Sequence, residues 1–212
     1  MSDAVITRAI AEDENQDLCS AGEYMQASVR AKLLAAERCL PSVVEAANLI
    51  AESLRKTGKL LICGNGGSAA DSQHMAAELV SSLYKGRSRP AIAAIALTTD
   101  TSILTAIGND FGYAKVFERQ VEALGQEGDV ILGISTSGNS ENVVRALECG
   151  RRRQMKSIAL IGGAGGKLND VADVVIRIPS DNTQHIQEVH LAFEHLLCML
   201  VEQKLFNSDA AS

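Results

Sequence analysis

Short apolar runs alternate with helix-periodic segments along most of the chain. The apolar runs predict strands over 59–64, 91–97, 129–135, 156–162 and 173–179. The segments that follow them predict helices over 68–84, 101–108, 114–125, 140–154 and 183–205. Continuously apolar strands that are each followed by a helix are typical of a parallel sheet covered on both faces. The pattern therefore predicts an α/β fold, a three-layer α/β/α sandwich with a central, mostly parallel five-stranded sheet.

Helical periodicity also precedes the first strand. Two helical patterns fill residues 18–57 and divide near "CLPS", where Pro41 suits the first turn of the second helix. Residues 1–17 are acidic and predict a frayed tail or a lead-in to the helix. We expect one domain over 18–207 with this N-terminal helical extension, followed by a short C-terminal tail, 208–212. The apolar stripes of the outer helices are expected to pack either within the subunit or against a partner subunit.

The composition of the chain argues against several classes of function. The net charge of −6 argues against general nucleic-acid binding and against anionic membranes. Aromatic residues make up 3% of the chain and tryptophan is absent, which disfavours stacking platforms. Five cysteines without a C-x-x-C pair indicate reduced thiols. With neither a signal-peptide pattern nor an apolar run near ~18 residues, we expect a cytoplasmic protein.

The first of two unusual turns, "CGNGGS" (63–68), joins the first predicted strand to a helix. Its glycines allow close backbone approach, and the helix start presents unpaired N–H groups to an anion. Ser68 is expected to cap that helix or to bond an oxyanion. The turn is neither G-x-G-x-x-G nor a P-loop, so a nucleotide is not the first expectation.

The second turn, "STSGNS" (135–140), follows the third predicted strand. Its hydroxyl groups are neutral donors that, with helix N–H groups, suit a phosphate dianion; they belong to Ser135, Thr136, Ser137 and Ser140. A plain capped turn has the same composition. Two such turns at strand carboxyl ends of one sheet favour a phosphorylated small molecule as ligand.

His74 and Glu78 lie four residues apart on the helix after the first turn and share a face. That spacing suits two ligands of one metal ion, an acid/base pair, or a simple solvated contact. On the last predicted helix, Gln187, His190 and Glu194 share one face, and His195 lies ~80° from Gln187. Spacing alone leaves both His190 and His195 open as partners of the first pair.

Three segments together resemble the phosphoheptose isomerases, the sedoheptulose 7-phosphate isomerases of the SIS (sugar isomerase) fold. They are "CGNGGSAADSQHMAAEL", "AIGNDFGYAKVFERQVEALGQEGDVILGISTSGNS" and "IQEVHLAFEH". The resemblance covers about 25–205 and implies a cytoplasmic homotetramer with active sites at subunit interfaces. It implies a substrate site at Asn65, Gly66, Gly67, Ser68, Asn109, Asp110 and Gln187, with Ser135, Thr136, Ser137 and Ser140 on the phosphate. It implies one Zn²⁺ held by His74, Glu78, Gln187 and His195, and so favours His195 over His190; His185 has no match.

The resemblance also implies a reaction. D-sedoheptulose 7-phosphate and D-glycero-D-manno-heptose 7-phosphate would interconvert through an enediolate, the first step of nucleotide-activated heptose biosynthesis for glycans such as lipopolysaccharide. We expect Glu78, which also contacts substrate, to be the carbon base and His195 the acid/base at oxygen. Two alternatives remain. One is a DiaA-type adaptor for the replication initiator, whose family lacks this Glu and this distal His; the other is a regulatory sugar-phosphate sensor, usually joined to a DNA-binding domain.

Overall fold

A five-stranded, entirely parallel sheet forms the centre of the fold in the computed structural model, which describes residues 3–84, 86 and 88–206, with side chains from 15 onward. Its strands are β1 (Leu60–Gly64), β2 (Ala94–Ala96), β3 (Val130–Ser135), β4 (Lys156–Ile161) and β5 (Val174–Arg177). Their order across the sheet is β2-β1-β3-β4-β5. The predicted α/β fold and all five strands are confirmed, although the edge strand β2 is shorter than the predicted run over 91–97.

Alternate residues of each central strand enter different cores. Leu60 and Ile62 of β1 pack on one face of the sheet, whereas Leu61 and Cys63 pack on the other. This alternation follows from the two-residue period of a strand, and every residue of β1 is buried because both faces are covered. The three-layer arrangement is therefore confirmed.

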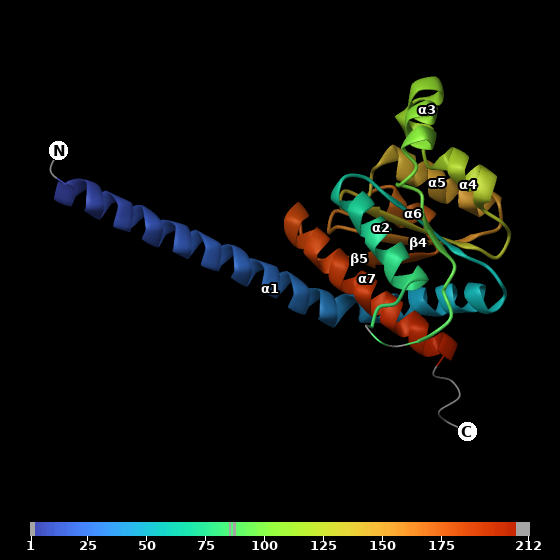
Figure 1. The fold of residues 1–212 in the computed structure, drawn as a ribbon, viewed down its shortest axis with the longest axis horizontal. Helices are drawn as coiled ribbons and strands as arrows, with labels where there is room; N and C mark the ends of the chain where they lie inside the picture. Colours follow the sequence, from blue (N-terminus) through green and yellow to red (C-terminus); the bar gives the residue numbers. More distant parts are fainter. Residues whose placement is uncertain (1–2, 85, 87, 207–212) are drawn as a thin grey trace.

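Helices α1 (Asp3–Arg55), α2 (Gly67–Val80) and α7 (Thr183–Phe206) supply the first core, as the cluster around Ile50, Met75 and Leu197 shows. The second core lies under α4 (Glu118–Leu124) and α5 (Glu141–Arg152). Helix α3 (Thr101–Phe111) and the short η1 (Tyr113–Lys115) follow β2, and α3 projects from the body in Figure 1. The four-residue helix α6 (Leu168–Val171) was not predicted.

Helix α1 corrects the sequence interpretation, because the predicted break at Pro41 is wrong. One helix continues through Pro41. A proline inside a helix removes one backbone hydrogen bond, but buried residues on both sides of it form one apolar stripe against the core: Ala31, Ala35, Cys39, Val43, Ala46, Ala47 and Ile50. Packing of this stripe outweighs the lost bond. Of the two alternatives for residues 1–17, the structure shows the helical one from Asp3 on; the tail over 208–212 lies outside the described residues.

The N-terminal part of α1 extends away from the body (Figure 1). Apolar side chains remain exposed on it, with Leu18 at 73%, Met25 at 60% and Leu33 at 65% of their surface accessible. The apolar residues of α1 therefore divide: one set packs within the subunit, and the other is left uncovered. Among the helices that the structure describes, none is long and apolar enough to cross a bilayer.

A polar cluster joins α1 to α7 where α1 leaves the body. The carboxylate of Glu188 accepts hydrogen bonds from Tyr24 (2.8 Å) and Ser28, and Lys32 lies 3.2 Å from it. These donors stabilise the ionised form and lower the pKa of Glu188 from 4.5 to about 2. The cluster fixes the start of α7 against α1.

This cluster predicts a pH-dependent contribution to stability. Because the pKa of Glu188 is lower in the folded chain, its contribution is complete above about pH 4.5 and is lost as the pH falls toward 2. We expect Glu188→Gln to reduce the free energy of unfolding by less than about 1 kcal/mol near pH 6, since the side chain is partly exposed, and by less still near pH 3. Urea unfolding at both values measures this. Equal differences at both, or the same pattern in the exposed control Glu45→Gln, would contradict it.

Candidate functional site

The carboxyl ends of β1 and β3 lie side by side in the sheet. Gly64 pairs with Ile134, so the turn after β1 and the turn after β3 emerge next to each other. In a doubly wound parallel sheet this is where the chain connections diverge to opposite faces and where ligands bind. A reciprocal amide pair joins the turns: Asn65 donates to Asn142 over 2.9 Å, and Asn142 donates back over 2.8 Å.

The first turn requires glycine at two positions, Gly66 and Gly67. Gly66 has φ of 58°, and a Cβ on Gly67 would lie 2.3 Å from the amide nitrogen of Gln187. Helix α2 begins at Gly67 with Gly66 as its N-cap, and Ser68 is buried inside the first turn. The expectation that Ser68 caps this helix is therefore wrong, while its role toward an oxyanion stays a prediction.

The second turn gathers hydroxyl groups at the start of α5. The Ser135 Oγ lies 2.9 Å from that of Ser140 and 3.4 Å from that of Ser137. Gly138 turns the chain with φ of 64°, and Thr136 is held through its carbonyl, which accepts from Gly162 over 3.0 Å. The arrangement offers neutral donors beside a helix N-terminus, as an anion site requires.

Asn109 and Asp110 lie at the end of α3, where Asn109 donates to Asp110 over 2.8 Å. Both are exposed. The Tyr113 hydroxyl just beyond them donates to Asn65 over 3.1 Å, which ties this segment to the first turn. Sequence reasoning missed Tyr113 and Asn142; the position of Asn142, directly after the serine-rich turn, was the signal that could have found it.

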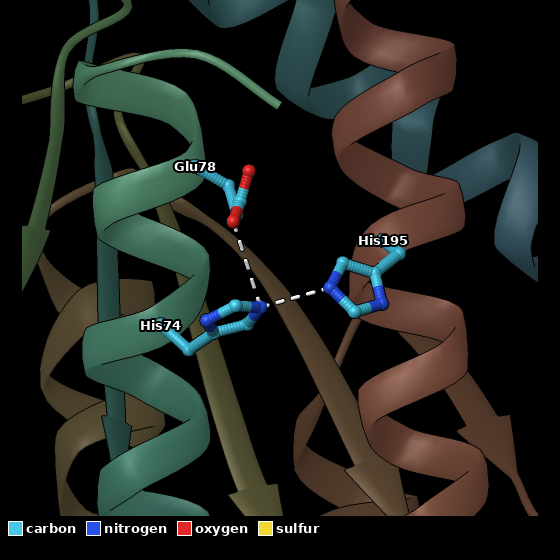
Figure 2. Close-up of side chains that lie close together, drawn as sticks. All are labelled: His74, Glu78 and His195. Atoms are coloured by element: carbon cyan, nitrogen blue, oxygen red, sulfur yellow. Dashed lines mark hydrogen bonds and ion pairs between the residues drawn. The ribbon is translucent and has the colours of Figure 1, made fainter. Parts of the chain in front are cut away.

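Helices α2 and α7 bring a second group together, as Figure 2 shows. The Nε2 atoms of His74 and His195 are 2.8 Å apart, and Glu78 Oε1 lies 3.7 Å from His74 Nε2. One ligand atom from each residue falls within 4.8 Å of the others. The other carboxylate oxygen of Glu78 is buried and has no hydrogen-bond partner among the described residues. Two imidazoles and a carboxylate this close could hold a metal ion.

Gln187 lies on α7 nearer the N-terminal ends of α2 and α7 than the three residues of that group. Its amide packs against Gly67, two turns before His195 on α7, a separation of about 12 Å along the axis. A cavity of about 380 Å³ opens there, with Gly67, Asp71 and Gln187 among its lining residues. The structure therefore brings together His74, Glu78 and His195 and places Gln187 along the groove rather than within that group.

The two remaining histidines, His185 and His190, are buried among the residues that pack around α7. His190 is fully buried with Nε2 3.4 Å from the carbonyl oxygen of Ile161, and burial lowers its pKa to about 4. His185 is buried with its ring centroid 4.8 Å from that of Tyr24. Both belong to the packing of α7, so the structure selects His195 as the partner of His74.

Two further carboxylates, those of Glu194 and Asp71, adjoin the group. Glu194 is 1% exposed and, among the described residues, neither of its oxygens has a hydrogen-bond partner. Burial, together with the charge of Asp71, raises the pKa of Glu194 to about 8. Burial also raises the pKa of Asp71, and the charge of His74 opposes that rise. Sequence reasoning gave Asp71 no role; its place one helical turn before His74 was the available signal.

Comparisons with known proteins identify the family of this chain. The SIS domain family model matches residues 23–162. The phosphoheptose isomerase of Roseiflexus sp. (strain RS-1) is 50% identical over 184 residues, which are 87% of this chain and 92% of that protein. A solved phosphoheptose isomerase from Francisella tularensis superposes with a TM-score of 0.85 at 40% identity, covering 88% of this chain and 98% of that one. The solved phosphoheptose isomerase GmhA from Neisseria gonorrhoeae gives 0.81 at 45%, with coverage of 89% and 98%. The chain therefore belongs to the SIS domain family and, within it, to the phosphoheptose isomerases.

Proposed function

We propose that this protein is an aldose–ketose isomerase that interconverts D-sedoheptulose 7-phosphate and D-glycero-D-manno-heptose 7-phosphate. The observation that carries the proposal is the approach of His74, Glu78 and His195 beside two anion-type turns in a chain of this family. The product would enter nucleotide-activated heptose biosynthesis, as the first step toward heptose-bearing glycans.

The serine-rich turn would hold the phosphate. Ser135, Ser137 and Ser140 converge there, and the positive end of the α5 dipole adds to their neutral donors. Thr136 would join them. At the first turn Asn65, Gly66, Gly67 and Ser68 would contact the sugar, as would Asn109 and Asp110 beyond α3 and Gln187 along the groove. Phosphate binding at a fixed turn would orient the reacting carbons toward α2 and α7.

Glu78 would move the proton between C1 and C2. Its Oε2 is buried and has no hydrogen-bond partner within the described part of the chain, so this oxygen is free to accept a proton from carbon at one position and return it at the other. His195 would donate to and accept from the neighbouring sugar oxygen, which stabilises the enediolate as charge develops on it. His74, 2.8 Å from His195, would fix the orientation of that ring.

The donor set also fits a metal ion. His74, Glu78 and His195 would hold Zn²⁺ through two imidazole nitrogens and a carboxylate. Gln187, whose amide packs against Gly67, would have to turn its side chain along the groove to become a further ligand. When bound, the ion would supply Lewis-acid polarisation of the sugar oxygens. The close approach of one ligand atom from each of the three residues, within 4.8 Å of one another, supports the fit. Glu78 would bind through Oε1, 3.7 Å from His74 Nε2, which leaves its Oε2 for the proton transfer.

We further propose a homotetramer in the cytoplasm with active sites at subunit interfaces. The exposed apolar residues of α1, including Leu18, Met25 and Leu33, support an interface with a second copy. Five free thiols support a reducing compartment. A DiaA-type adaptor gains no support from the comparisons, and no feature of the described residues favours a regulatory sensor.

The catalytic assignment predicts a loss of turnover in two variants. We expect Glu78→Gln and His195→Gln each to lower kcat with sedoheptulose 7-phosphate by on the order of 10²–10⁴, because each removes a proton-transfer group. Formation of the heptose product measures this in purified protein, with the exposed Glu52→Gln as the control. Wild-type protein without turnover would refute the isomerase, and full turnover in both variants would refute the mechanism.

The metal assignment predicts bound zinc in protein purified without chelators. Elemental analysis should find about one Zn²⁺ per chain, and His74→Ala should lose most of it because one ligand is gone. His190→Ala serves as the control, since His190 lies in the core rather than in the group. An active wild-type enzyme without metal would remove zinc from the mechanism.

The phosphate assignment predicts sensitivity at Gly138. Its φ of 64° disfavours any side chain, and a Cβ there would lie 1.6 Å from the carbonyl oxygen of Gly165. We expect Gly138→Ala to raise KM for the sugar phosphate at least tenfold and to cost at least about 1–2 kcal/mol of stability. Gly22→Ala on α1 is the matched control, because nothing lies within 4 Å of its added Cβ. An unchanged KM in Gly138→Ala would argue against a phosphate at this turn.

A further inference from the structure

A second cavity, of about 490 Å³, lies between α1 and the carboxyl end of β5. Helix α1 contributes Arg38, Cys39 and Ser42, and the end of β5 with the following loop contributes Arg177, Ser180 and Asp181. None of these residues belongs to the isomerase site described above. The volume is in the range of cavities that bind small molecules.

Two arginine side chains, Arg38 and Arg177, line this cavity. Within the described residues, neither the Arg38 nor the Arg177 guanidinium forms a salt bridge or a hydrogen bond, whereas Arg89, Arg145 and Arg152 all pair with glutamates. Asp181 lines the same cavity but lies in no salt bridge with either arginine. Two guanidinium groups around one hollow are a typical arrangement for an oxyanion, which they can bind through parallel N–H donors.

Cys39 shows that both charges act at the same place. Its thiol is buried and donates to the Arg177 carbonyl oxygen over 3.2 Å. Burial raises the pKa of this thiol, and the positive charges of Arg38 and Arg177 both oppose the rise. The two guanidinium groups therefore direct their fields at the same buried wall of the cavity.

Hydroxyl groups complete the set of donors. The Ser180 Oγ accepts from the Asn182 N–H over 3.2 Å, which leaves its own proton available, and Ser42 is half-buried beside Arg38. A compact dianion would match two arginines and two hydroxyls. Asp181 and the net charge of −6 disfavour extended polyanions such as nucleic acid.

We propose that this cavity binds the phosphate monoester of a small metabolite, held by Arg38 and Arg177, at a site separate from the isomerase site. The Arg177 side chain also covers the glycine-rich loop after β4: its Nη1 lies 3.7 Å from where a Gly165 Cβ would be. The other side of that loop contacts Gly138 in the serine-rich turn. Two phosphate sites would thus flank one loop, and a test must separate them.

Calorimetric titration with inorganic phosphate separates the two sites. Wild-type protein should bind two phosphates per chain, whereas Arg38→Ala/Arg177→Ala and Ser137→Ala/Ser140→Ala should each bind one. Adding the arginine changes to the serine variant should weaken the remaining binding at least tenfold. The readout needs no turnover, and the loss of one bound phosphate on the arginine changes tests the arginine cavity whether or not the serine-rich turn binds another.

The matched control is Arg30→Ala/Arg151→Ala, which removes the same charge from exposed positions outside the cavity. It should leave both binding events unchanged, and equal weakening would overturn the proposal. Circular dichroism checks that the arginine variant folds; if it does not, Arg177→Gln alone replaces it. A crystal of the wild-type protein soaked in tungstate should show anomalous density between the two arginines. Density only at the serine-rich turn would overturn the proposal.

Discussion

The parallel pairing of β1 with β3 is the constraint on which the rest of the site depends. Because these strands are adjacent and Gly64 lies opposite Ile134, their turns must leave the same edge of the sheet at neighbouring positions. The helices that follow then diverge, α2 to one face and α5 to the other. The reciprocal amide pair of Asn65 and Asn142 fixes the spacing between the turns. A shift of one residue in this register would exchange the faces of every β1 side chain and separate the turns.

The packing of α2 beside α7 adds the second requirement. Gly67 contacts Gln187, and about two turns further along both helices His74 contacts His195. The two helices therefore run in the same direction and stay side by side over these two turns. This seam carries polar groups that a stable core would exclude. Glu194 is buried without a partner among the described residues, which costs folding free energy unless its carboxyl is protonated, and the raised pKa favours the protonated form. Such a cost is typical of functional surfaces rather than of structural ones.

Periodicity and turn composition predicted most of the fold and part of the site. The strands were predictable because burial on both faces leaves an unbroken apolar run, as in "LLIC" of β1. The continuation of α1 through Pro41 was not predictable, since the packing of the buried stripe on both sides of the proline is a tertiary effect. Spacing on α7 left His190 and His195 equivalent; only the position of α2 decides which one meets His74. Asp71, Asn142 and Tyr113 were missed because each acts through a contact distant in sequence.

Helix α1 connects these features through its length. One part of its surface closes the first core, another lines the arginine cavity with Arg38 and Cys39, and Ser28 and Tyr24 hold Glu188 at the start of α7. Glu188 adjoins Gln187 in the chain, and both line the groove beside α2. A helix broken at Pro41 could turn these surfaces independently, whereas a continuous one fixes their relative orientation. The unbroken packing across Pro41 is therefore a requirement for the geometry of the groove as well as for the stability of the core.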